Sequence, residues 1–292
     1  MPLTLQLSGQ VKDLGGGFVV RRLLPSAARQ AVGPFLFFDH FGPVTVEPDS
    51  HHDVRPHPHI GLATVTYLFE GAMVHRDSTG VVQRIEPGAI NWMTAGRGIV
   101  HSERTPDDLR GAVRRSHGLQ LWVALPAEHE EDAPSFEHTP ASAIPQTRRA
   151  GVTLRVLVGE AFGLRSPVHT LSPTLYLDFD FSTAGDAALA VPAAAEERAL
   201  YGVDHGFTLD GSVVPAHTLA VLPAGAEPVL AAPQGGRIVL VGGAPLGPRF
   251  IVWNFVSSRE ERVRQAQDDW AAQAMGQVPG ETEFIPLPPR RA

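Results

Sequence analysis

Two pairs of side chains that can bind a metal ion lie in the first half of the chain. His57 and His59 form a His-x-His pair, and His101 and Glu103 form a His-x-Glu pair with the same spacing. In an extended strand, residues two apart point to the same side, so each pair can direct both donor atoms at one point. Either pair alone is a weak signal, but the two together predict a metal site.

The four donors are three imidazoles and one carboxylate, a set that suits a divalent first-row transition metal. The chain contains no cysteine, which excludes thiolate ligands, cysteine nucleophiles and disulfides. A carboxylate ligand favours a hard ion such as Fe(II) or Mn(II), and four protein ligands on an octahedral ion leave two positions open for substrate and for dioxygen or water. A closed tetrahedral set would instead indicate structural zinc. Glu103 could also act as a base if its bond to the metal is loose.

The elements that must position these residues are short β-strands. The chain has 29 Gly and 26 Pro, which divide it into short apolar runs, the pattern of antiparallel strands joined by tight turns. Runs rich in β-branched and aromatic residues predict strands at residues 63–69, 73–77, 81–85, 89–93, 118–125, 152–158, 174–181, 219–222 and 237–241. Regularly spaced short strands are typical of sandwiches and barrels, so we predict an all-β fold.

One α-helix is predicted, near the carboxyl end of the chain. Residues 257–270 contain no Gly or Pro, and they carry Val263, Ala266 and Trp270 at helical spacing. Ser257 is the expected N-cap residue, and acidic residues follow it in the first turn.

A change of composition predicts the division of the chain into domains. From about residue 126 to residue 149 the sequence becomes rich in Glu, His, Pro and Ala, with one short strand expected at 135–137. We therefore predict four parts: an amino-terminal β-domain with both metal-binding pairs, a connector, a second β-domain, and a helix followed by an extended proline-rich tail. Their boundaries are 1–130, 131–150, 151–256 and 257–292.

The composition excludes several classes of function. The 292 residues are 43% hydrophobic and 19% charged, as in a globular protein with a sizeable core. A formal net charge of −7 and the lack of a dense Lys/Arg cluster argue against nucleic-acid binding. No apolar run approaches the roughly 18 residues needed to cross a bilayer, and residues 1–6 lack the basic and apolar segments of a signal peptide. We expect a cytoplasmic monomer.

Several other histidines are interpreted as structural, because a single histidine on a strand is more often hydrogen-bonded than metal-binding. These histidines are His75, His117, His129, His138, His169, His205 and His217. His51, His52 and the acidic run Glu130-Glu131-Asp132 are expected to be solvated, and Gly15-Gly16-Gly17 is interpreted as a turn because no phosphate-binding context follows it. The residues that could either line a site or fill the core are Phe35, Phe37, Phe38, Phe41, Trp92 and Met93.

Longer motifs around these residues resemble the pirin family of the bicupin superfamily. The most specific are residues 34–43 (PFLFFDHFGP), 55–62 (RPHPHIGL) and 92–103 (WMTAGRGIVHSE). Residues 242–247 and 253–258 resemble the end of bacterial pirins. The resemblance spans nearly the whole chain and is strongest from about residue 33 to residue 117.

The resemblance implies two stacked, jelly-roll-like cupin β-barrels, with a mononuclear non-haem iron in the first. His57, His59, His101 and Glu103 fall where pirins have their metal ligands. General cupins carry a glutamate four or five residues after the His-x-His pair, but here those positions are Ala63 and Thr64, as in the pirin variant. The second barrel shows no comparable pair, so we expect it to be free of metal.

The resemblance also implies two alternative functions. Some pirins are associated with quercetin 2,3-dioxygenase activity, in which a flavonol loses its 3-hydroxyl proton, here to Glu103, and its ring is opened by dioxygen with loss of carbon monoxide. Others are associated with protein partners, and the oxidation state of the iron would then control partner binding. A third alternative is a cupin without oxygen chemistry. Open metal positions favour the dioxygenase, with a flavonol-like substrate and Fe(II), or Mn, Ni, Cu, Co or Zn as a substitute.

Overall fold

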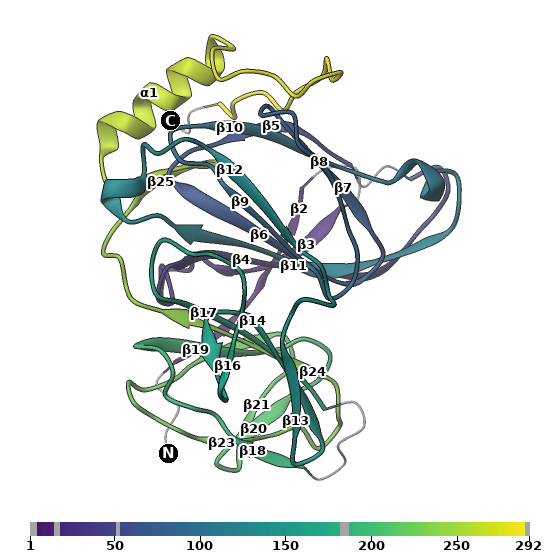
Figure 1. Ribbon diagram of the computed structural model, residues 1–292, viewed down its shortest axis with the longest axis vertical. Helices are drawn as coiled ribbons and strands as arrows, with labels where there is room; N and C mark the ends of the chain where they lie inside the picture. The colour runs from purple at the N-terminus through teal and green to yellow at the C-terminus, as the bar shows by residue number, and fades with distance from the viewer. Residues whose placement is uncertain (1–4, 15–17, 51–52, 182–186, 290–292) are drawn as a thin grey trace. The chain divides into compact units, whose positions relative to one another are not determined.

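The structure, a computed structural model, describes residues 5–14, 18–50, 53–181 and 187–289. Our interpretations of Gly15-Gly16-Gly17, His51 and His52 concern residues outside these ranges. The fold is mostly β, as predicted, with one α-helix near the carboxyl end (Figure 1). The chain divides into two compact units: unit 1 comprises residues 1–12, 20–40 and 139–245, and unit 2 comprises residues 13–19, 41–138 and 246–292.

Most boundaries between the two units fall inside strands rather than in loops. The strands that contain a boundary are β2 (Gln10–Asp13), β3 (Val19–Leu24), β4 (Phe35–Val46) and β12 (Ser135–Thr139). β12 confirms the short strand predicted within the connector. The domain boundaries given above remain a prediction.

Unit 1 contains a large and a small antiparallel sheet. The large sheet has the order β1 (Leu5–Ser8), β22 (Thr218–Val221), β19 (Glu197–Gly202), β24 (Arg237–Gly243), β17 (Thr174–Asp180), β14 (Val152–Val158) and β13 (Gln146–Arg149). The small sheet has the order β18 (Ala188–Ala190), β23 (Val229–Ala231), β20 (Phe207–Leu209) and β21 (Ser212–Val214). A short hairpin joins β15 (Glu160–Ala161) to β16 (Leu164–Arg165).

The core of unit 1 forms where these two sheets meet. Leu177 and Phe179 of β17 alternate with polar residues, and they pack in one buried cluster with Phe207 and Leu230 of the small sheet. Both faces of β17 are buried, and the period of two in the sequence sets which of its side chains join this cluster.

Unit 2 holds the strands that carry the predicted metal ligands. One sheet has the order β5 (Val54–His59), β10 (Ile99–Arg104), β7 (Met73–Asp77) and β8 (Val82–Ile85). In another, neighbouring strands are β12, β9 (Ile90–Thr94), β6 (Leu62–Glu70) and β11 (Arg114–Ala124). The remaining elements are the hairpin of β25 (Phe250–Val252) and β26 (Phe255–Ser257), and the 3₁₀ turns η1 (Asp107–Leu109) and η2 (Ala127–His129). Every strand predicted from the sequence overlaps a strand of the structure.

The predicted helix is α1 (Glu260–Ala271), which packs against β25 and β26 (Figure 1). Val263, Ala266 and Trp270 are its buried face, as their spacing predicts. The prediction that Ser257 caps this helix is wrong, because the N-cap residue is Arg259 and no side chain caps the first turn. Ser257 instead ends β26, where its hydroxyl donates to Glu130 at 2.7 Å and accepts from the backbone of Arg259 at 3.1 Å.

Glu130 also differs from expectation, because it is buried rather than solvated. Only 2% of the residue is exposed, and its carboxylate accepts hydrogen bonds from Ser257 and Ser258 and forms an ion pair with Arg249 at 3.0 Å. These partners lie more than a hundred residues away in the sequence, which is why an acidic run in a loop gave no sign of them.

A glycine fixes the approach of β26 to the end of β5. Gly61 has φ of +66°, and a Cβ atom there would lie 2.0 Å from the carbonyl oxygen of Val256. Only glycine accommodates both conditions without strain. Ile60, the residue before it, forms a parallel bridge with Phe255.

No helix formed by the described residues has the length and apolar character needed to span a membrane.

Candidate metal site

β5 and β10 run antiparallel in a register that brings three of the predicted ligands together. His101 lies directly opposite His57, and Ile99 lies opposite His59. Residues opposite one another in an antiparallel pair have side chains on the same face, with Cβ atoms about 5 Å apart. The His-x-His spacing along β5 and this register therefore place three imidazoles on one face of the sheet.

The three imidazoles form a compact buried cluster. The ring centroids of His57 and His101 lie 4.3 Å apart, and the His59 ring lies 5.0 Å from each of them. One ligand atom from each residue lies within 4.8 Å of the other two. All three residues are at most 8% exposed. The geometry is that of a group which can hold one metal ion.

Two prolines alternate with the histidines in β5. Pro56 and Pro58 lack a backbone N–H, and the outer strand of a sheet tolerates that lack. The register with β10 shifts by one residue between His101 and Glu103, so that Glu103 lies opposite Val54. Such a bulge redirects the side chains that follow it.

The hydrogen bonds of the three rings leave one nitrogen of each available to a metal. His57 Nδ1 donates to the backbone carbonyl of Arg55 at 2.9 Å, which leaves Nε2 as its ligand atom. The His59 ring is hydrogen-bonded to the backbone of Asn254. His59 Nδ1 and His101 Nε2 are buried and have no hydrogen-bond partner among the described residues. Two such orphaned nitrogens side by side are costly in a folded protein unless they bind an ion, so the site fits a metal.

The ring of His101 is oriented by His75 and Asp77, which both lie on β7. His101 Nδ1 lies 3.4 Å from His75 Nδ1, and His75 Nε2 lies 2.9 Å from Asp77 Oδ2. If His75 donates from Nε2 to the carboxylate, its Nδ1 accepts the proton of His101 Nδ1. The lone pair of His101 Nε2 is then directed at the cluster. Thr79 fixes Asp77 with two further hydrogen bonds at 2.8 and 2.6 Å.

Burial keeps the three imidazoles neutral. Desolvation lowers the pKa of His57 to about 4, against a weaker opposing effect of its bond to Arg55. It also lowers the pKa values of His59 and His101 well below their usual range, and the neighbouring histidines add to the effect. Neutral imidazole is the form that binds a metal, so the site is ready for an ion at neutral pH. Burial would raise the pKa of Asp77, but its bonds to His75 and Thr79 outweigh burial and lower it.

The fourth predicted ligand, Glu103, is not part of the three-histidine group. Its Oε1 accepts a long hydrogen bond, 3.5 Å, from the hydroxyl of Thr66 on β6, and the same hydroxyl donates to Gln120 Oε1 at 3.0 Å. Desolvation raises the pKa of Glu103 to about 7, with Thr66 opposing the shift. Because Thr66 has a single proton to share, a protonated Glu103 would satisfy this arrangement better than an ionised one. Its role as a metal ligand stays a prediction.

Aromatic rings adjoin the cluster, but they are not those considered from the sequence. Trp122 of β11 meets the His59 ring edge-on at 5.2 Å between centroids, and Phe136 of β12 stacks on His75 at 4.3 Å. Phe35 and Phe38 are fully buried and contact tyrosines of unit 1. Of the two alternatives given for them above, they therefore fill the core.

His75 contacts the cluster in a way that the sequence did not predict. A single histidine on a strand is more often structural than metal-binding, and this gives His75 a structural interpretation from the sequence. The signal was present, since His75 and Asp77 have the same spacing of two as both ligand pairs. Because β7 pairs with β10, this spacing places Asp77 opposite His101 and His75 opposite Glu103.

A mostly β chain with a buried three-histidine group that could hold a metal ion is typical of the cupin class. The profile of the family described as Pirin matches residues 17–123, and that of the Pirin C-terminal cupin domain matches residues 176–276. The chain belongs to the pirin family. The family and the fold with two cupin domains and a carboxyl-terminal helix, predicted from the sequence motifs, are thus confirmed.

Relatives are similar over nearly the whole chain. The "Pirin-like protein" of Caulobacter vibrioides is 46% identical, over 98% of this chain and 99% of the relative. A protein of Pseudomonas aeruginosa named "Putative quercetin 2,3-dioxygenase" is 38% identical, over 92% of this chain and 84% of the relative. The crystal structure of a quercetin 2,3-dioxygenase from Acinetobacter baumannii has a TM-score of 0.89 and 33% identity, over 99% of this chain and 96% of that one.

Proposed function

We propose that the chain is a mononuclear non-haem iron protein with quercetin (flavonol) 2,3-dioxygenase-like activity. In this proposal Fe(II) is bound by His57, His59 and His101, with Glu103 as a fourth ligand. The observation that carries the proposal is the buried three-imidazole cluster with its orphaned nitrogens. Relatives named for quercetin 2,3-dioxygenase support the choice of reaction.

The chemistry divides between the ion and the protein. When bound, the ion supplies open coordination positions and one-electron chemistry. Three neutral imidazoles leave the charge of a divalent ion uncompensated, which favours a substrate bound as an anion. Burial raises the pKa of Glu103 in the metal-free protein to about 7, and a bound cation would lower it, so Glu103 would accept the proton of a flavonol 3-hydroxyl as a carboxylate that is ionised near neutral pH. The same carboxylate cannot hold the ion tightly and accept this proton at one moment, so the proposal requires its metal bond to be loose.

The decisive experiment is an anaerobic titration of the Fe(II)-loaded protein with quercetin. We expect the absorption band of the flavonol to shift to that of its anion, and we expect oxygen uptake and carbon monoxide release when air is admitted. A flavone without the 3-hydroxyl group is the matched control ligand and should give neither signal. The variant His101→Ala should abolish both signals. A loaded wild-type protein that shows no shift and no oxygen uptake with a panel of flavonols would disprove the dioxygenase.

That silent result would leave the regulatory alternative, in which the oxidation state of the iron controls a protein partner. Capture of partners by the Fe(II) and Fe(III) forms would test it. Identical partners and affinities for both forms would count against a redox switch.

A further inference from the structure

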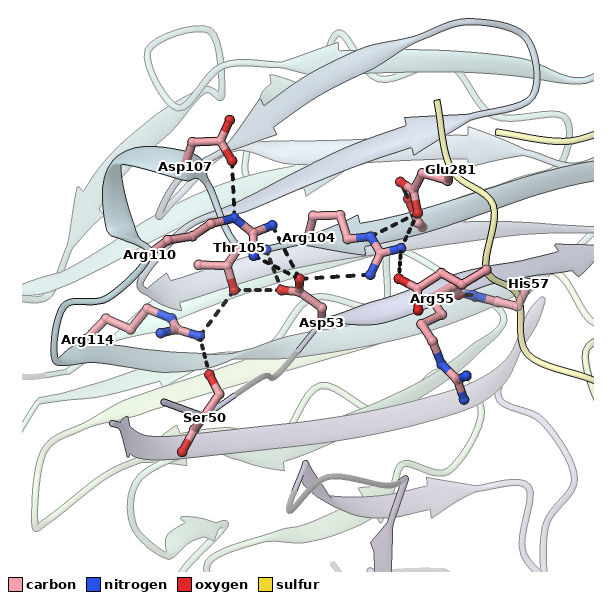
Figure 2. A network of polar contacts seen from close by, with 12 residues as sticks. Ser50, Asp53, Arg55, His57, Arg104, Thr105, Asp107, Arg110, Arg114 and Glu281 are labelled. Atoms are coloured by element: carbon pink, nitrogen blue, oxygen red, sulfur yellow. Dashed lines mark hydrogen bonds and ion pairs between the residues drawn. The ribbon is translucent and has the colours of Figure 1, made fainter. Parts of the chain in front are cut away.

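The carboxyl-terminal segment after α1, residues 272–289, is attached to the two strands that carry the metal ligands. We call this segment the strap. It is held near β10 by a network of charged side chains that includes Arg104 and Glu281 (Figure 2). It is held near β5 by a backbone hydrogen bond from Ile285 to Pro56. Nothing in the proposed function requires either contact.

On β10, the strap contacts Ser102 and Arg104, which alternate with the predicted ligands. His101 faces the three-histidine cluster, so Ser102 and Arg104, at odd spacings from it along β10, point to the opposite face of the strand. The hydroxyl of Ser102 donates to Glu281 Oε1 at 2.5 Å, and Arg104 Nε donates to Glu281 Oε2 at 3.0 Å. Ser102 is fully buried, and only 12% of the Glu281 side chain is exposed. Charge-assisted bonds that are shielded from water in this way are among the stronger polar contacts in proteins.

Two further carboxylates of the network lie near Arg104. Glu283 accepts from Arg104 at 2.7 Å, and Asp53, next to the start of β5, lies 3.9 Å from it (Figure 2). Asp53 in turn accepts two bonds of 2.7 Å from Thr105. The network therefore links the beginning of β5, the end of β10 and the strap.

On β5, the strap completes the outer edge of the strand. Ile285 donates its N–H to the carbonyl of Pro56 at 2.8 Å, directly between Arg55, which orients the His57 ring, and His57 itself. Trp270 of α1 donates to the carbonyl of Ile285 at 3.1 Å, so the helix anchors the strap at this point. The ring of Trp270 is buried in a cluster with Val100 of β10 and Val278 of the strap.

We propose that the strap is a positioning element of the metal site and that Glu281 is its principal positioning residue. Glu281 fixes β10 from behind, and Ile285 fixes β5 from its edge, so the strap sets the distance between His101 and the pair His57 and His59. The inference rests on the metal-binding part of the proposed function and not on its reaction. Because coupling between two sites is reciprocal, metal binding must also stabilise the attachment of the strap.

The test compares two neighbouring glutamates of the strap in the full chain. Glu281→Gln removes the charge of the largely buried carboxylate but keeps the size of the side chain. Glu283→Gln removes a half-exposed charge that pairs with Arg104. Co(II) affinity is measured by competition with a chromophoric chelator, and the visible Co(II) band reports the geometry of the ligands. We expect Glu281→Gln to bind Co(II) about tenfold more weakly with an altered band, as when an outer partner of a ligand is lost. Glu283→Gln should stay within about twofold of the wild type.

A second variant and a second measurement keep the test independent of folding. Ser102→Ala removes one hydroxyl and should weaken Co(II) binding in the same direction. Hydrogen exchange of the wild-type chain should show slower exchange of the Ile285 amide after Co(II) is added. Unchanged Co(II) affinity in both variants, or unchanged exchange at Ile285, would overturn the inference. If the wild type binds no Co(II) at the histidines, the proposed function fails instead, and the two failures are thereby distinguished.

Discussion

The direction in which His101 presents its lone pair depends on two residues that do not touch the cluster centre. If His75 carries its proton on Nε2 and donates it to Asp77, then His75 Nδ1 is an acceptor for His101. The tautomer of a metal-binding histidine is commonly fixed by such an outer partner. A carboxylate at position 77 is thus needed for its acceptor character as much as for its charge.

Asp77→Asn tests this chain of hydrogen bonds. The amide of Asn can donate to His75 Nε2, which would place the His75 proton on Nδ1, facing that of His101. We expect metal affinity to fall by about 10- to 100-fold, measured by Zn(II) competition. Asp132→Asn is the matched control, because Asp132 pairs with the exposed His129 at 2.7 Å outside the site. Equal affinities of the Asp77 variant and the wild type would show that the pair does not orient His101.

Glu103 gives the metal-free protein a pH dependence with a definite sign. Its folded pKa, about 7, is raised above the ordinary value of 4.5, so the folded state binds more protons than the unfolded state between these pH values. The carboxyl therefore destabilises the fold as pH rises from about 4.5 to 7, and its contribution is constant above that range. His57, with its pKa lowered to about 4, acts in the opposite direction: its contribution to stability increases as pH rises from about 4 to 6.5.

Glu103→Gln should remove the first effect. We expect the metal-free variant to gain on the order of 2 kcal/mol over the wild type at pH 8 and to match it near pH 4. Urea unfolding at the two pH values measures the difference. Glu70→Gln is the control, since the side chain of Glu70 is 42% exposed and pairs with Arg115, which is 51% exposed. A difference between variant and wild type that does not change with pH would mean that folding does not shift the pKa of Glu103.

At this scale the sequence predicted that the three histidines lie together, because a period of two is a local property of strands. It did not predict the partnership of His75 with His101, since that partnership depends on which strand pairs with β10. The same spacing of two also predicted Glu103 as a ligand, but the structure does not include Glu103 in the three-histidine group.

At the scale of elements, the junction of β26 and α1 is held by a buried carboxylate from a distant loop. Glu130 accepts bonds from Ser257 and Ser258 and pairs with Arg249, whose side chain is only 7% exposed. Helix periodicity predicted the buried face of α1 correctly. It could not predict where the helix begins, because the long-range bonds of Glu130 draw Ser257 and Ser258 away from the capping role.

Glu130→Gln should destabilise unit 2 by about 3 kcal/mol, because it leaves the buried guanidinium of Arg249 without a counter-charge. Glu131→Gln, the adjacent position, should cost less than about 1 kcal/mol, since Glu131 is roughly half exposed and pairs with Arg259, which is also about half exposed, and with Arg262. The free energy of unfolding in urea measures both variants. Similar losses for the two variants would contradict the structural role assigned to Glu130.

At the scale of the whole molecule, each of two units is assembled from separate segments of the chain. Residues 20–40 group with residues 139–245, and the carboxyl-terminal segment groups with residues 41–138. The sequence predicted the fold class and the family because strand patterns and motifs are local. It did not predict this grouping, which depends on strand pairings across long separations, such as β1 with β22. The contacts of the strap with β5 and β10 are also long-range, so the sequence did not predict them.

This organisation predicts one metal ion per chain, bound in unit 2. Among the described residues, the only group of three metal-binding side chains is His57, His59 and His101. We expect metal analysis of the loaded chain to give one equivalent, and His101→Ala to give close to none. Because an ion that binds only the folded state stabilises it, a free concentration about 100 times Kd should add about 2.7 kcal/mol and raise the Tm by roughly 5 to 10 °C.

An exposed histidine of unit 1, His205, provides the control for that prediction. His205→Ala should keep one equivalent of metal and the full rise in Tm, whereas His101→Ala should lose both. Because His101→Ala also removes a buried ring and its contact with His75, each variant is compared with its own metal-free form, so that the rise in Tm on metal addition reports the ligand and not the fold. Two equivalents in the wild type, with one retained in His101→Ala, would place a second ion elsewhere in the chain and contradict the prediction.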